Sequence, residues 1–173
     1  HAREHSLEVQ LPFLQAVAGE FTFVPICLAA HRYEVAEEIG VAIAQTIREQ
    51  REPIGIIASS DLNHYEDQSE TLRKDQIAID RVLARDPADL WAAVDAYDIS
   101  MCGCIPTTAM LVAANALGAT TARLIKHATS GDVSGDFEHV VGYASMVVAG
   151  RTAGAAQPLP AIDEAGLIQL MKR

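Results

Sequence analysis

The 173-residue sequence predicts an α/β domain in which helices flank a mixed β-sheet. Two observations lead to this fold class. Helical and strand-like patterns alternate along the chain. One short run, residues 54–58, is apolar on both faces and therefore suits a strand in the middle of a sheet. Half of the residues are hydrophobic, which is enough to build a substantial core.

In the first half of the chain we expect a helix at 6–19, a strand at 21–28, a helix at 33–50 and a strand at 54–58. Pro12 cannot lie in the middle of a helix, so the first helix should break near Leu11. Pro25 marks the end or an exposed edge of the first strand. Apolar residues recur at every fourth position of the second helix, which makes it amphipathic.

In the second half we expect helices at 66–85, 86–97 and 106–117, followed by strands at 122–128 and 140–148. Asp86 is a good N-cap because a proline follows it, and Pro106 suits the first turn of the next helix. Gly118 ends that helix. A polar, turn-rich loop joins the last two strands.

The domain should extend over residues 1–150, and residues 151–173 should be a linker with one short helix. The chain begins at His1 without a methionine, so we expect it to be part of a longer protein. Its 13 basic and 23 acidic residues give a net charge of −10, and its basic residues are scattered, which argues against a nucleic-acid partner. No apolar run approaches the roughly 20 residues that cross a membrane. Three cysteines make no disulfide framework, so a cytoplasmic location is expected.

The segment Ser59-Ser60-Asp61-Leu62-Asn63-His64 follows the predicted central strand directly. Ligands of open α/β sheets bind at the carboxyl ends of such strands. An aspartate can orient a histidine, and a histidine titrates near neutral pH, so Asp61 and His64 are candidates for acid–base catalysis. The alternative is that Ser60 or Asp61 merely caps the helix that follows.

A second motif, Cys102-Gly103-Cys104-Ile105-Pro106, lies just before a predicted helix. The positive end of a helix favours a thiolate, which can bind a metal or react. A redox pair, half of a zinc site, and two small buried cysteines at a turn all remain open as explanations.

His5 and Glu8, which follow Glu4, are three residues apart and would share one face of a helix. They could hold a metal or share a proton there. The alternative is an ordinary pair of surface residues. The remaining polar candidates are His31, His139, Asp132 and Asp136, which we interpret as structural residues. The alternative for the two aspartates is that they are calcium ligands.

Four blocks, EHSLEVQLPFL, SSDLNHY, MCGCIP and TSGDVSGDFEHVVGYAS, occur in this order and together resemble the Memo family. Its bacterial and archaeal members are labelled AmmeMemoRadiSam system protein B. The resemblance extends to about residue 150. It implies a fold similar to that of the class III (LigB-like) extradiol dioxygenases, of which this chain would be the C-terminal part, with the N-terminal part missing.

The resemblance also implies a pocket. Cys102 would bind a metal together with two upstream histidines, whose motifs do not occur in this sequence. His64 would act as acid and base, and Asp61 would lie beside it. Further candidates for residues around the ligands are His5 and Glu8, from their spacing, and Cys104, to which the family assigns no role.

The resemblance implies a metal-dependent redox protein that holds iron or another transition metal and acts on an unknown substrate. One alternative is a non-catalytic adaptor that uses the pocket to bind a peptide or small molecule. Another is an accessory protein to a radical-SAM enzyme and an AMMECR1-type protein.

Overall fold

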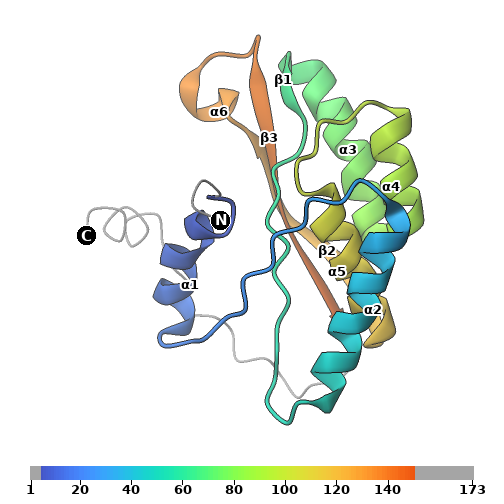
Figure 1. Cartoon of the computed structure of the whole chain (residues 1–173). Coiled ribbons are helices and arrows are strands. Elements are labelled where there is room, and N and C mark those ends of the chain that lie inside the picture. Colours follow the sequence, from blue (N-terminus) through green and yellow to red (C-terminus); the bar gives the residue numbers. More distant parts are fainter. Residues whose placement is uncertain (1–4, 151–173) are drawn as a thin grey trace. The chain divides into compact units, whose positions relative to one another are not determined.

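The computed structural model describes residues 5–150, which fall into two units (Figure 1). The first unit, described up to Cys27, contains a 3-10 turn, η1 (Glu8–Gln10), and helix α1 (Leu11–Ala18). Pro12 lies in the first turn of α1, where its missing N–H would have no partner anyway. The predicted break near Leu11 is therefore confirmed. Gly19 ends the helix with a φ of +68°.

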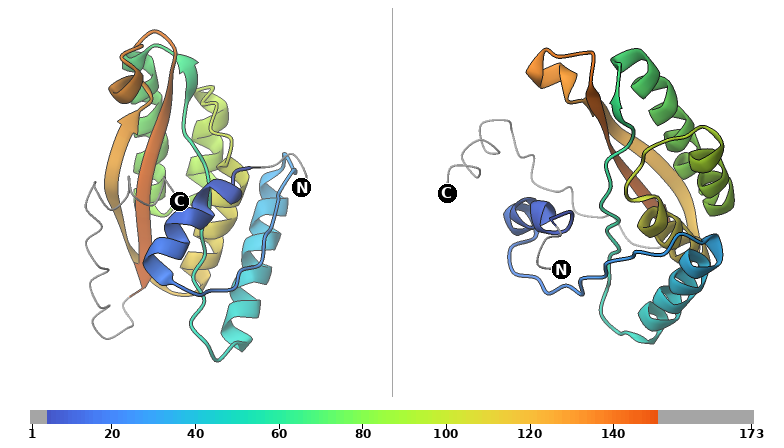
Figure 2. Two further views of the ribbon diagram at one scale, coloured as in Figure 1. Left: turned by 90° about the vertical axis from the view of Figure 1, so that its left-hand side faces the viewer. Right: turned by 45° about the horizontal axis from the view of Figure 1, so that its top comes forward.

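The second unit, described from Leu28 onward, consists of helices packed on a small sheet (Figures 1 and 2). Its long helices are α2 (Tyr33–Glu49), α3 (Gln68–Ala84), α4 (Pro87–Ala96) and α5 (Cys104–Ala116). Its strands are β1 (His64–Glu66), β2 (Ala119–Thr129) and β3 (Val140–Gly150), with the short helix α6 (Gly131–Ser134) between the last two. Helices α3 and α5 contact the sheet, and α2 packs against α5. No described helix is long and apolar enough to cross a membrane.

The sheet has the order β1-β3-β2, and all of its strand pairs in the described residues are antiparallel. The α/β class is thus confirmed, but a mixed sheet is not what forms. The predicted strands at 122–128 and 140–148 are confirmed as the β2–β3 hairpin, each somewhat longer than predicted.

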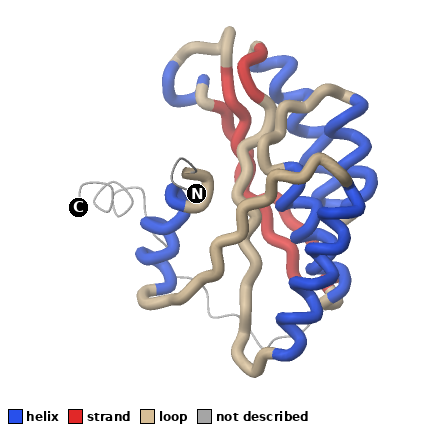
Figure 3. Tube along the Cα trace, viewed as in Figure 1, coloured by secondary structure: helices blue, strands red, loops and turns tan. Residues whose placement is uncertain are grey.

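The two predicted strands at 21–28 and 54–58 are wrong, because both segments are loops in the structure (Figure 3). Among the described residues, no backbone hydrogen bond joins either segment to a strand. A strand exists only through a neighbour, so an apolar β-branched run without one stays irregular. In the first segment Val24 is 82% exposed. In the second segment Ile57 is 55% exposed, which contradicts its predicted burial inside a sheet.

Helices α3 and α4 each begin at a capping residue, which is why the start of a helix can be predicted from the sequence. Asp67 caps α3 by accepting a hydrogen bond from the Glu70 N–H, and Asp86 caps α4 in the same way. The suggestion that Ser60 or Asp61 caps the helix after it is therefore wrong. Helix α5 begins at Cys104, two residues before Pro106, so Gly103 takes the N-cap position.

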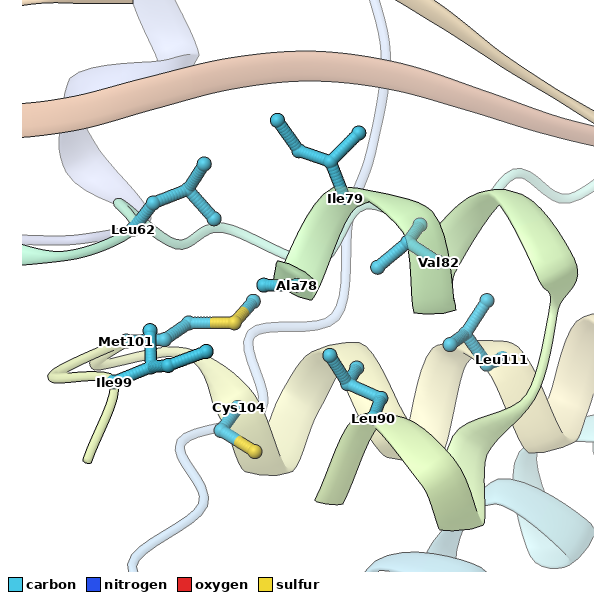
Figure 4. Close-up of a cluster of buried hydrophobic side chains, with 9 residues drawn as sticks. All are labelled: Leu62, Ala78, Ile79, Val82, Leu90, Ile99, Met101, Cys104 and Leu111. Atoms are coloured by element: carbon cyan, nitrogen blue, oxygen red, sulfur yellow. The ribbon is translucent and has the colours of Figure 1, made fainter. Parts of the chain in front are cut away.

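The main core lies between α3, α4, α5 and the sheet (Figure 4). Its buried members are Leu62, Ala78, Ile79, Val82, Leu90, Ile99, Met101, Cys104 and Leu111. Leu62 belongs to the loop that contains Asp61 and His64, and Met101 belongs to the loop that contains Cys102. Both loops are thus anchored in one hydrophobic cluster, which positions the polar residues beside them.

Candidate functional site

Asp61 and His64 lie side by side at the junction between the loop after α2 and strand β1. The Asp61 Oδ1 and His64 Nε2 atoms are 2.8 Å apart, and the two side chains are 31% and 17% exposed. Their orientation does not satisfy hydrogen-bond geometry, so each of these buried atoms lacks a hydrogen bond within the described part of the chain. Unsatisfied buried polar atoms are costly and often mark places where a ligand binds.

The residue next to this pair has an unusual backbone. Tyr65 has a φ of +62°, which is rare for a residue with a bulky side chain. Its ring is 77% exposed, and its centroid lies 5.6 Å from that of His64. Strained backbone conformations cluster at functional sites, so this outlier supports a role for the segment.

Cys102 lies in the loop between α4 and α5, beside Asp61. Burial of its sulfur raises the pKa of the Cys102 thiol, although the residue as a whole is exposed. A hydrogen bond to the Asp61 carboxylate raises that pKa further. Burial and the Asp61 carboxylate thus act against the thiolate that a position before a helix would favour.

The two loops are joined by close contacts that sequence patterns did not reveal. The Gly103 N–H donates to Ser60 Oγ at 2.9 Å, and a Cβ on Gly103 would lie 2.3 Å from Ser60 Cβ. Only glycine allows this approach. The Ser100 N–H donates to Asn63 Oδ1 at 3.2 Å, and Ser100 Oγ accepts from the His64 N–H at 2.7 Å.

A second acid–histidine pair, Asp75 and His127, lies beneath the Asp61–His64 loop. The Asp75 carboxylate is fully buried, lies 2.7 Å from His127 Nε2, and accepts a 2.9 Å hydrogen bond from the Asn63 N–H. Burial raises the pKa of Asp75, and the hydrogen bonds from Asn63 and His127 partly offset this. Sequence reasoning missed the pair. The available signal was that α3 places polar residues on its buried face, at Thr71, Lys74 and Asp75.

The other candidate residues have the following surroundings, each within its own unit. Cys104 is buried in the core, and burial raises the pKa of its thiol. His5 Nδ1 and Glu8 Oε2 form the predicted pair at 2.8 Å, but both side chains are at least 70% exposed and belong to the first unit. Asp132 accepts from the Thr129 N–H and Asp136 from the Glu138 N–H, which are turn contacts. His31 and His139 are exposed.

Within residues 5–150, no group of three or more His, Cys, Asp or Glu side chains is arranged to hold a metal ion. A cavity of about 330 Å³ adjoins the two loops, but neither the Asp61–His64 pair nor Cys102 lines it. Its walls are mostly apolar and include Ile56, Leu62, Met101 and Met146, with the Ser60 and Thr107 hydroxyls as polar groups.

Replacing Asp61 with asparagine should make Cys102 more reactive. Removing the negative charge lowers the thiol pKa, so more thiolate is present at pH 7.5. We expect alkylation by iodoacetamide, followed by peptide mass spectrometry, to be faster than in the wild type. Asp80→Asn, an exposed change on α3, should leave the rate unchanged; a slower rate in Asp61→Asn would contradict the assignment.

Comparisons with known proteins agree with the four sequence blocks. The Memo-like protein family model matches residues 1–147. The chain is 50% identical over 148 residues to a MEMO1 family protein of Methanopyrus kandleri, covering 85% of this chain and 52% of that protein. It is 47% identical over 152 residues to one of Methanocaldococcus jannaschii (86% and 53%) and 48% identical over 148 residues to one of Thermotoga maritima (86% and 52%). The chain thus spans about half the length of these curated relatives. By its family match and its identity to these proteins, the chain belongs to the Memo family.

Proposed function

We propose that this chain contributes the acid–base pair and one thiol ligand to a metal-dependent redox site of the class III extradiol dioxygenase type. The observation that carries the proposal is the contact of Asp61 with both His64 and Cys102. Asp61 Oδ1 lies 2.8 Å from His64 Nε2, and the same carboxylate interacts with the Cys102 thiol. Three chemically different groups thus converge from two loops.

The donor types suit a transition metal, because thiolate and imidazole ligands select such ions. The number of donors does not suffice, because the described residues contain no group of three ligands. Residues 5–150 therefore do not complete a metal site, and the remaining ligands would come from polypeptide outside them. We propose iron as the metal, as the resemblance implies.

The role of the described residues is to handle protons. With one imidazole nitrogen of His64 facing Asp61, its other nitrogen is available to exchange a proton with a bound substrate. Asp61 would orient the ring and stabilise it when it is protonated. Burial and the same carboxylate raise the pKa of the Cys102 thiol, and a bound metal would have to be held by its thiolate form.

Metal binding tests the proposal. A full-length protein that contains this chain, expressed anaerobically with iron, should bind iron stoichiometrically. Cys102→Ala should weaken binding by at least about tenfold and remove any thiolate-to-metal charge-transfer absorption. Cys27→Ala, at an exposed cysteine of the first unit, is the matched control and should bind normally.

His64→Gln separates the two parts of the proposal. It should retain most of the bound iron, because His64 is assigned to proton transfer and not to metal ligation. If the protein binds no iron, or Cys102→Ala binds it as well as the wild type, the proposal is wrong. A non-catalytic binding role for the same pocket would then be favoured.

A further inference from the structure

Asn63 lies between Asp61 and His64 in the sequence, and its hydrogen bonds connect their loop to the rest of the unit. It is fully buried, and each of its polar groups is hydrogen-bonded. Its backbone N–H donates to Asp75 Oδ1 at 2.9 Å, and its C=O accepts from the Gly142 N–H at 2.9 Å. The backbone is therefore held on both sides by the body of the unit.

The side chain of Asn63 reaches in two directions. Its Nδ2 donates to Glu66 Oε2 at 2.6 Å, which orients the amide. Its Oδ1 then faces Ser100, accepting from the Ser100 N–H and from Ser100 Oγ, each at 3.2 Å. The same Ser100 hydroxyl accepts from the His64 N–H at 2.7 Å. One hydroxyl thus joins the Asn63 side chain to the His64 backbone, across 36 or 37 positions of sequence.

These contacts lie at defined positions around the candidate site. The pair Asn63–Ser100 and the pair Ser60–Gly103 link the same two loops. In the first loop they lie on either side of Asp61, and in the second they lie on either side of Cys102. Two such links fix both the distance and the relative rotation of the loops, which a single contact would not.

We propose that Asn63 is a positioning residue that holds the Cys102 loop against Asp61 and His64, so that the carboxylate meets the thiol. The inference concerns the site of the proposed function but is independent of any metal. It predicts that the influence of Asp61 on Cys102 disappears when the Asn63–Ser100 link is broken.

A double-mutant cycle tests this prediction. The readout is the ratio of the Cys102 alkylation rates with and without Asp61→Asn, at one pH, with the exposed Cys27 as internal reference. In the wild-type background Asp61→Asn should raise the rate, so this ratio should differ clearly from one. It should fall to about one in Asn63→Ala and should shrink in Ser100→Ala, which loses only the hydroxyl.

The combined change Asn63→Asp with Glu66→Gln is the matched rescue. It preserves net charge and keeps an acceptor for Ser100. It also restores the hydrogen bond between positions 63 and 66, with the new glutamine as the donor and the new aspartate as the acceptor. The wild-type ratio should return. Ile79→Val, a core change that lowers the melting temperature without touching the link, should also keep it.

An Asn63→Ala protein that is destabilised but keeps the full ratio would overturn the proposal and make Asn63 a merely structural residue. If Asn63→Ala does not fold, Ser100→Ala decides, because an unchanged ratio there would equally overturn it. Iron binding does not enter this measurement, so a failure of the proposed function and a failure of the positioning role are distinguishable.

Discussion

Gly142→Ala is expected to destabilise the protein by about 4 kcal/mol. A Cβ at this position of β3 would lie 1.9 Å from Asp75 Oδ2 and 2.6 Å from Asp75 Cγ. The carboxylate cannot simply move away, because it is fully buried and bonded to Asn63 and His127. The cost therefore combines steric overlap with the loss of buried hydrogen bonds to a charged group.

Urea unfolding followed by circular dichroism measures this loss. Gly55→Ala is the matched control, because a Cβ there meets no atom within 4 Å and the residue is exposed. It should change the free energy of unfolding by less than about 0.5 kcal/mol. A Gly142→Ala protein as stable as Gly55→Ala would show that Asp75 does not occupy the position described.

Asp75→Ala is expected to cost about 3 kcal/mol at pH 7. It leaves the buried Asn63 N–H without its acceptor and removes the partner of His127. Asp80→Ala, at an exposed position of the same helix, should have little effect. Unfolding curves of the two variants give the comparison directly, and equal stabilities would contradict a central role for the buried carboxylate.

Asp75→Asn isolates the charge, because it keeps the shape and an acceptor for Asn63. Burial raises the pKa of Asp75 in the folded state, so the folded protein holds this proton more tightly than the unfolded chain. The resulting stability is present below the ordinary carboxyl pKa of about 3.9 and is lost as the pH rises through the raised value.

The stability of the wild type relative to Asp75→Asn should therefore fall between pH 4 and pH 7. The measurement is the difference in the free energy of unfolding between the two proteins at these pH values. A difference that grows with pH would mean that the contact with His127 outweighs burial and lowers the pKa of Asp75.

Helices and the final hairpin were predictable because their signals are local. Asp86 followed by a proline begins α4, and Gly118, with a φ of +88°, follows the end of α5. Apolar periodicity found α2, although the residues most deeply buried in it are the small ones, Ala36, Gly40 and Ala44. A Cβ on Gly40 would lie 2.6 Å from Ala109 O in α5, so close helix packing selects them.

The sequence by itself determined the helices, the β2–β3 hairpin, the Memo resemblance and the residue types of the candidate site. Each depends on neighbours within a few positions or on a motif. Only the tertiary structure decided that segments 21–28 and 54–58 stay unpaired, because a strand requires a partner strand, and the position of that partner is not encoded in neighbouring residues. It also decided that the Cys102 loop meets the Asp61 loop and that Asp75 accepts a hydrogen bond from Asn63. The hydrogen bonds Asn63–Asp75 and Ser60–Gly103 join residues 12 and 43 positions apart, which no local sequence pattern predicts.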